Sequence, residues 1–265
     1  MFTESIREPA VAGSFYPADP VELEAQLDEL LAAVTTRYPP PKAMIVPHAG
    51  YIYSGPVAAS GYASLIPVAD RIKRVVLLGP AHRKAFSGLA VPASTVFKTP
   101  LGKIELDKQS ISKILLLPQV HTDNDAHLLE HSLEVHLPFL QRVLRAFTLV
   151  PLVVGDASAQ DVSEVIQQLW GGRETLLVIS SDLSHFLDYD SARVRDAATS
   201  RAIERLAYED IDYHDACGRN PVSGLLHYAR SHDQAIKTID LRNSGDTAGP
   251  RDRVVGYGTW LLTGT

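Results

Sequence analysis

The sequence predicts an α/β fold with a mostly parallel central sheet flanked by helices. Short apolar runs that are typical of buried strands alternate along the chain with segments of helical spacing. Several of these runs are followed directly by polar side chains that can bind a metal. Ligands of open α/β sheets bind beyond the carboxyl ends of the strands, so the same pattern also predicts where a site lies.

The expected elements follow from these runs. Internal strands are expected at residues 43–46, 74–78, 147–154 and 175–180. Two further strand-like runs, 235–241 and 254–262, are expected at an edge of the sheet. Helices are expected at 20–34, 55–65, 159–169 and 191–206, and the prolines at 39–41 form a loop after the first of them.

Length and composition are those of an ordinary globular protein. The chain has 265 residues, of which 45% are apolar and 21% charged, so it can bury a sizeable core. We see no repeat and no low-complexity linker, and we therefore expect a single domain over residues 1–265.

Charge and cysteine content restrict the cellular setting. The net charge of -6, without a cluster of Lys and Arg, argues against a nucleic-acid partner. The N-terminal segment lacks the apolar region of a signal peptide, and no apolar run reaches the roughly 18–20 residues that span a bilayer. With Cys217 as the one cysteine, a disulfide within the chain is impossible. We expect a cytoplasmic protein that does not bind membranes.

Histidines follow two of the predicted strands. His48 lies two residues beyond the first strand, and His82 lies four residues beyond the second. Each of them alone could be a loop histidine that hydrogen-bonds the backbone. Two at the same sheet edge favour a metal site, because neutral imidazole is a common ligand for Zn, Fe and Cu.

A third polar group follows the strand at 175–180. Asp182 and His185 are three residues apart, so in a helical turn they would share a face. Asp182 could bind a metal or orient an imidazole, and His185 could be a ligand or a general base. The alternative is that Ser181 or Asp182 caps a short helix.

The segment Glu130 to His136 resembles the H-E-x-x-H zinc motif only superficially, because its two histidines are five residues apart. It is either a polar helix start or a wall of the pocket, with Glu130 or His131 as the lining residue.

Cys217 precedes a helix expected to begin near Pro221 with Asn220 as its cap. The helix dipole would lower the pKa of that thiol, although a lone cysteine is more often a buried structural residue.

Five segments, in this order, resemble the Memo family: REPAVAGSFYP (7–17), PHAGY (47–51), EHSLEVHLP (130–138), SDLSH (181–185) and CGR (217–219). The resemblance runs from about residue 7 to the C-terminus. It implies the fold of the catalytic subunit of class III extradiol dioxygenases, which are non-haem iron enzymes. Partners implied for prokaryotic members are a radical-SAM protein and an AMMECR-like protein in one pathway.

The resemblance also implies residue roles. His48 and His82 match the two histidine ligands, and His185, beside Asp182, matches the acid/base. Cys217 falls near the metal, where the dioxygenases have a glutamate ligand. A thiolate is softer and oxidisable, so the resemblance implies a metal or redox site more firmly than ring cleavage.

Three functions remain open from the sequence. The first is metal-dependent redox or oxygenase chemistry with iron or copper on His48, His82 and Cys217. The second is a zinc hydrolase on the same ligands. The third is a non-enzymatic module that binds a peptide or small ligand. The pocket would be lined by Phe15, Tyr53, Arg83, Glu130 and His131, and Phe15 and Tyr53 match aromatic positions at which animal members are described as binding phosphotyrosine peptides.

Overall fold

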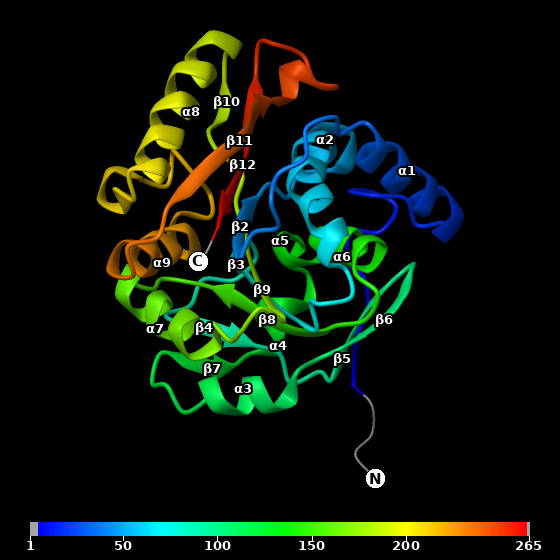
Figure 1. The fold of residues 1–265 in the computed structure, drawn as a ribbon, viewed down its shortest axis with the longest axis vertical. Coiled ribbons are helices and arrows are strands. Elements are labelled where there is room, and N and C mark those ends of the chain that lie inside the picture. The colour runs from blue at the N-terminus through cyan, green and yellow to red at the C-terminus, as the bar shows by residue number, and fades with distance from the viewer. Residues whose placement is uncertain (1–4, 264–265) are drawn as a thin grey trace.

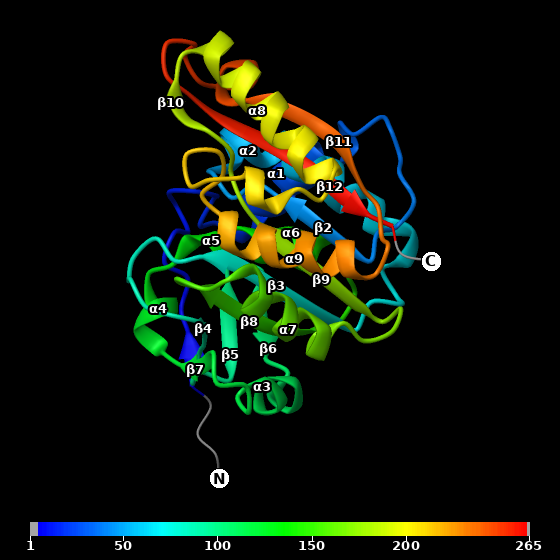
Figure 2. The ribbon, with the colours of Figure 1, turned by 90° about the vertical axis from the view of Figure 1, so that its left-hand side faces the viewer.

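The computed structural model describes residues 5–263. It is an α/β structure in which helices cover both faces of a large mixed sheet (Figures 1 and 2). The strands are β1 (Ile6–Arg7), β2 (Ala43–Val46), β3 (Arg74–Pro80), β4 (Leu89–Val91), β5 (Val96–Thr99), β6 (Gly102–Glu105), β7 (Val120–Thr122), β8 (Thr148–Val154), β9 (Thr175–Ser180), β10 (His185–Leu187), β11 (Ile236–Asn243) and β12 (Val254–Leu262).

The α-helices are α1 (Pro20–Ala32), α2 (Tyr51–Tyr62), α3 (Lys108–Ile114), α4 (Asn124–Leu128), α5 (His131–Glu134), α6 (His136–Val143), α7 (Ala159–Leu169), α8 (Tyr189–Glu204) and α9 (Arg219–Ser231). Short 3-10 helices lie at Ala63–Val68, Tyr208–Asp210 and Ser244–Asp246. The expected helix at 159–169 is confirmed to the residue, and the others shift by a few residues at their ends.

The large sheet has the order β10-β12-β2-β9-β3-β8-β4-β7, and β11 also pairs with β12. Its centre is parallel: β2 pairs with β9, and β3 pairs with both β9 and β8. Antiparallel pairs flank this centre, β12 on β2 at one side and β4 on β8 at the other. A smaller sheet joins β1, β5 and β6.

The position of β12 differs from the expectation. Residues 254–262 were expected at an edge, but β12 lies between β2 and β10 and also pairs with β11. All of its residues except Val255 are buried. An edge strand would leave one row of its backbone groups unpaired, so an almost wholly buried apolar strand is better placed inside the sheet.

Two apolar cores lie on the two faces of the sheet. Side chains from α1, α2 and α6 form one core with inward residues such as Met44 and Val75. Helices α7, α8 and α9 form the other with residues such as Ile45 and Val76. Neighbouring strand residues thus point to opposite cores, and both faces of the central strands are buried.

The arrangement sets the position of the site. Strands β2, β3 and β9 run parallel side by side, so the segments that follow Val46, Pro80 and Ser180 meet at one edge of the sheet.

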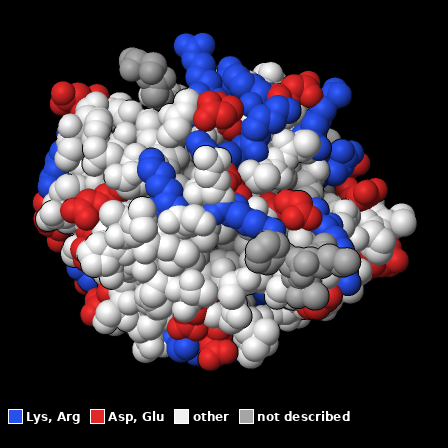
Figure 3. Space-filling model, turned by 90° about the horizontal axis from the view of Figure 1, so that it is seen from below, with Lys and Arg blue, Asp and Glu red and all other residues white. Residues whose placement is uncertain are grey.

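No helix within residues 5–263 is long and apolar enough to cross a membrane. From below, charged side chains of both signs are visible, with basic ones concentrated along one margin (Figure 3).

Candidate metal centre

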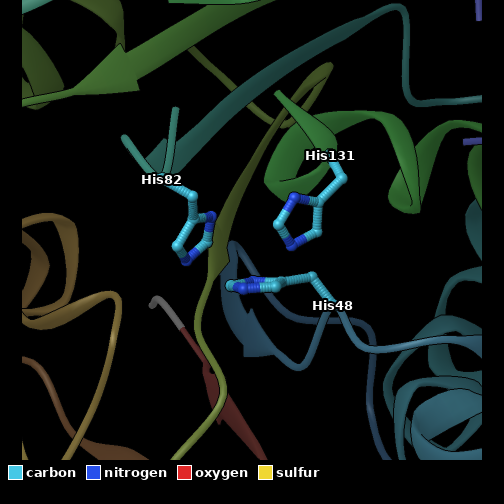
Figure 4. A group of neighbouring side chains, drawn as sticks. All are labelled: His48, His82 and His131. Atoms are coloured by element: carbon cyan, nitrogen blue, oxygen red, sulfur yellow. The ribbon is translucent and has the colours of Figure 1, made fainter. Parts of the chain in front are cut away.

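Three histidine rings converge at the carboxyl edge of the sheet (Figure 4). His48 follows β2, His82 follows β3, and His131 is the first residue of α5. One ligand atom of each lies within 4.8 Å of the others. The ring centroids of His48 are 5.2 Å from His82 and 5.6 Å from His131, and His82 stacks on His131 at 4.7 Å. Three imidazoles this close can share one ion.

Hydrogen bonds fix the tautomer of His48. Its Nδ1 lies 2.5 Å from the Ser180 hydroxyl, which itself donates to the Ser132 carbonyl at 2.6 Å. Because a carbonyl can only accept, the hydroxyl proton is used there, and His48 Nδ1 must be the donor to Ser180. The lone pair of His48 is therefore on Nε2. Burial, with the neighbouring histidines adding to it, lowers the pKa of His48, so the ring is neutral.

Glu130 orients His82. The carboxylate accepts the backbone N–H of His82 at 2.6 Å and contacts its Nδ1 at 2.9 Å. It also accepts the N–H of Ser132 at 2.9 Å. Burial alone would raise the pKa of Glu130, but its hydrogen bonds and the charge of His82 outweigh burial and hold it at about 2. An ionised carboxylate on Nδ1 leaves His82 Nε2 facing the site, which is the usual outer contact of a metal-binding histidine.

His131 completes the group. Burial lowers its pKa to about 4, with the positive charges of His82 and Arg83 acting in the same direction. Its Nδ1 is buried and makes no hydrogen bond within residues 5–263, although Glu130 Oε1 lies 3.5 Å away. The Phe15 ring packs on the other side at 4.8 Å. A neutral imidazole with an unused buried nitrogen is what an ion ligand requires.

Cys217 and Asp182 lie on the other side of His48. The Cys217 sulfur is 3.5 Å from His48 Nε2 and accepts the backbone N–H of Asp182 at 3.3 Å. The Asp182 carboxylate accepts the N–H of His48 at 2.7 Å and reaches to 4.0 Å from its Nε2. Burial raises the pKa of Asp182 to about 6.

A helix does follow Cys217 with Pro221 in its first turn, but the lowered thiol pKa and the Asn220 cap are wrong. Burial raises the pKa of the thiol, and the charge of Asp182 raises it further, so the helix dipole does not dominate. Helix α9 begins at Arg219 with Gly218 as its N-cap. Asn220 instead donates its amide to the Gly155 carbonyl at 2.8 Å.

His185 lies at the rim of the site. It begins strand β10, so the expected helical turn with Asp182, and a helix cap by Ser181, are wrong. The Ser181 hydroxyl donates to the carbonyl of Asp182. His185 Nδ1 donates to the Leu183 carbonyl at 2.8 Å, which leaves the lone pair on Nε2. The charge of His185 acts on the pKa values of both Asp182 and His48, so it is within electrostatic reach of the group.

The other residues expected to line the pocket differ in how close they lie to the three histidines. Phe15 contacts His131, and Arg83 is exposed but close enough to act on the pKa of that ring. Tyr53 is 36% exposed on α2 and acts electrostatically on the buried Tyr257. No ring contact joins Tyr53 to the three histidines among the described residues.

Sequence reasoning missed the hydroxyls of Ser132 and Ser180. Ser132 also donates to the Pro80 carbonyl at 2.8 Å, which connects α5 to the end of β3. Serine is frequent in loops and at strand ends, so only its position as the last residue of β9 could have drawn attention to Ser180.

The donor set fits a borderline or soft metal ion. Nitrogen and sulfur ligands that share one tetrahedral ion lie about 3.4–3.6 Å apart, given bond lengths of about 2.0–2.3 Å. The 3.5 Å between the Cys217 sulfur and His48 Nε2 meets that requirement. Neutral imidazoles beside a thiol suit iron, copper or zinc better than Mg²⁺ or Ca²⁺.

The chain was also compared with known proteins. The family model described as "Memo-like protein" matches residues 7–261. The chain belongs to the Memo family. A "MEMO1 family protein" of Aquifex aeolicus is 39% identical and aligns over 95% of this chain and 97% of its own. Relatives with the same name from Methanosarcina acetivorans (36% identical; 97% and 99% covered) and Sulfolobus acidocaldarius (34%; 95% and 97%) match nearly end to end.

Proposed function

We propose that this Memo-family chain is a non-haem metal protein that carries out redox or oxygenase-type chemistry with iron or copper. The observation that carries the proposal is the convergence of three imidazole rings, with the Cys217 sulfur 3.5 Å from His48 Nε2. Redox-active ions accept this mixture of nitrogen and sulfur donors. The free thiol also suits a reducing compartment, so we place the protein in the cytoplasm.

We assign His48, His82 and Cys217 as the ligands. Ser180 and Glu130 hold the first two rings with Nε2 toward the site, so their lone pairs are preorganised. The bound ion would supply electron transfer to or from the substrate. His131 is the competing third ligand, because its ring nitrogen is within 4.8 Å of those of His48 and His82.

Asp182 and His185 would handle protons. The pKa of Asp182, raised by burial to about 6, lets its carboxyl hold or release a proton near neutral pH. His185 offers an Nε2 lone pair at the exposed rim, since its Nδ1 proton is bound to the Leu183 carbonyl. A proton can then be exchanged between the buried site and solvent.

A cavity beside the proposed ligands would receive the substrate. It has a volume of about 380 Å³, and both His82 and Cys217 line it together with Phe86, Tyr213 and Pro221. That volume suits a small molecule or the side chain of a peptide. Aromatic and proline side chains form much of its wall, which favours a ligand with an apolar part.

The test is metal loading of anaerobically purified protein. We expect one equivalent of Fe(II) or Cu(I) per chain, measured by elemental analysis after desalting, and its loss in His48→Ala. In Cys217→Ser we expect loss of the sulfur-to-metal absorption of a Co(II)-substituted sample, whereas His131→Ala should keep it. His214→Ala, at an exposed residue, is the matched control. Absence of a stoichiometric ion under every loading condition would refute the proposal.

A further inference from the structure

A second cavity lies at the opposite edge of the sheet from the histidines. Its volume is about 330 Å³, and it is formed where β2, β3 and β9 begin. The lining residues are Pro40, Pro41, Lys42, Arg71, Ile72, Trp170, Gly171, Gly172, Arg173, Thr175 and Gln234. Three of them are basic and none is acidic, in a chain whose net charge is -6. The cavity thus has a local excess of positive charge, although the chain as a whole is negatively charged.

Lys42 supplies a fixed charge. Its Nζ donates to the carbonyls of Trp170 at 2.5 Å, Gly172 at 2.7 Å and Thr175 at 2.7 Å. An ammonium has three N–H donors, so all of them are used inside the protein. Burial lowers the pKa of Lys42 to about 8. An anion placed beside this ammonium would favour its charged form.

Arg71 and Arg173 supply the free donors. Within residues 5–263 neither guanidinium has a hydrogen-bond, ion-pair or aromatic partner, although most of the other arginines in that range do. Each presents five N–H donors in a planar fork that matches the spacing of two oxygens on one phosphorus or carbon. The two arginines line the cavity from different loops, Arg71 from the loop before β3 and Arg173 from the loop before β9.

One carboxylate lies close to the cavity: burial lowers the pKa of Lys42, and the charge of Glu174 opposes that shift. Glu174 is adjacent in sequence to Arg173, but its Oε1 accepts the N–H of Gly172 at 3.0 Å and the Thr175 hydroxyl at 2.9 Å. The same atom lies 3.5 Å from Arg74. Its charge is therefore shared among Lys42, Arg74 and the loop itself, and it makes no ion pair with Arg71 or Arg173. The buried Oε1 of Gln234 has no hydrogen-bond partner, and rotation of that amide would offer an NH₂ donor.

We propose that this cavity binds a small ligand through an oligophosphate group, with Arg71 and Arg173 as direct contacts and Lys42 as the fixed charge. Three positive charges without a lining acid require a multiply charged anion. The volume exceeds that of a single phosphate and suits a diphosphate. The Trp170 ring lines the cavity and is contacted by Lys42 at 5.1 Å and by Tyr228 at 4.3 Å.

The phosphate site does not depend on the metal proposal, although the two lie at opposite ends of the same strands. Lys42, Arg74 and Thr175 stand at the amino ends of β2, β3 and β9, whose carboxyl ends lead to His48, His82 and Asp182. The same three strands therefore carry the basic cavity at one end and the candidate metal centre at the other.

The experiment is calorimetric titration of the full chain with inorganic pyrophosphate. We expect saturable 1:1 binding that weakens as salt is raised, because the contact is electrostatic. Arg71→Gln and Arg173→Gln should each weaken it about tenfold, the loss expected for one charge-assisted oxyanion contact. Arg205→Gln, at an exposed arginine ion-paired to Asp210, should leave it unchanged.

Tryptophan fluorescence gives an independent readout. The sequence has two tryptophans, and Trp260 is fully buried, so an anion-dependent change reports on Trp170. Tighter binding of a nucleoside diphosphate than of pyrophosphate would identify the ligand as a nucleotide. Tighter binding of pyrophosphate would identify it as a free oligophosphate. Equal affinity for citrate would overturn the phosphate assignment. No calorimetric binding, or binding that both arginine variants retain, would overturn the site.

Discussion

Two polar clusters that include Glu134 and His131 stand a few residues apart in the chain, and they differ in how far their hydrogen bonds are satisfied. The Glu134 carboxylate accepts from Arg7, from the Tyr16 hydroxyl at 2.6 Å, and from the N–H groups of Ala10 and Val11 at 2.8 and 3.0 Å. Three residues earlier, His131 has a buried nitrogen without a hydrogen bond.

The difference separates a structural cluster from a functional one. Glu134 closes a loop of the N-terminal segment onto α5, and its neighbours leave no lone pair for a ligand. In the histidine group, Ser180 and Glu130 contact the Nδ1 atoms of His48 and His82, and the Cys217 sulfur lies 3.5 Å from His48 Nε2. The buried Nδ1 of His131 has no hydrogen-bond partner, which costs free energy in the absence of a ligand.

The largest effect on stability is expected at Glu134. Replacement Glu134→Gln leaves the buried Arg7 guanidinium without its counter-charge, which should lower the free energy of unfolding by about 3–5 kcal/mol. Guanidinium unfolding measures it. The matched control is Glu209→Gln, which breaks the exposed pair with Arg230 and should cost about 1 kcal/mol or less. If both variants lost the same free energy of unfolding, the pair of Arg7 and Glu134 would be no more important for stability than an exposed ion pair.

The next effect is on metal affinity. Glu130→Gln places an NH₂ group against the N–H donors of His82 and Ser132, so His82 loses its orientation. We expect the dissociation constant of the ion to rise about 10–100-fold. Competition with a chelator measures it, and Asp125→Asn, at an exposed carboxylate, serves as control. An unchanged metal affinity would show that metal binding does not require Glu130 to orient the His82 ring.

Stability is expected to fall as the pH is lowered from 6.5 toward 4. Burial lowers the pKa of His127 and of His131 to about 4 and that of His136 to about 3, so in this window the unfolded chain binds protons that the folded chain does not. Each ring contributes at most about 1.4 kcal/mol per pH unit. Asp182 and Asp196, each with a pKa raised by burial to about 6, act in the opposite direction.

Unfolding curves between pH 4 and 7 test this balance. His127→Leu should make the acid loss smaller by the share of this ring, because the leucine has no proton to bind. His214→Leu, at an exposed position, should keep the slope of the parent chain. A slope that does not change in His127→Leu would contradict the assignment of the acid loss to this ring.

The smallest effect is expected at Phe15, which joins the two clusters. Its segment is anchored by Glu134, and its ring packs on His131 at 4.8 Å. Phe15→Leu should cost about 1 kcal/mol of stability through the lost ring contact. If the clusters are independent, metal affinity in this variant stays near that of the parent. A tenfold change would show that the N-terminal segment governs the site.

The sequence by itself determined the local elements. The bounds of β2, β9 and α7 follow from apolar runs and caps that lie within a few residues of one another. The carboxyl ends of β2, β3 and β9 also brought His48, His82 and Asp182 to one edge, because parallel neighbouring strands must end together.

The tertiary structure decided which polar groups are paired and which are open. Arg7 and Glu134 are 127 residues apart, and no local pattern connects them. The place of β12 inside the sheet, the raised pKa of Cys217 and the approach of His131 all depend on burial and long-range packing. Periodicity reports the conformation of neighbouring residues, whereas desolvation and hydrogen bonding depend on segments that meet only in the folded chain.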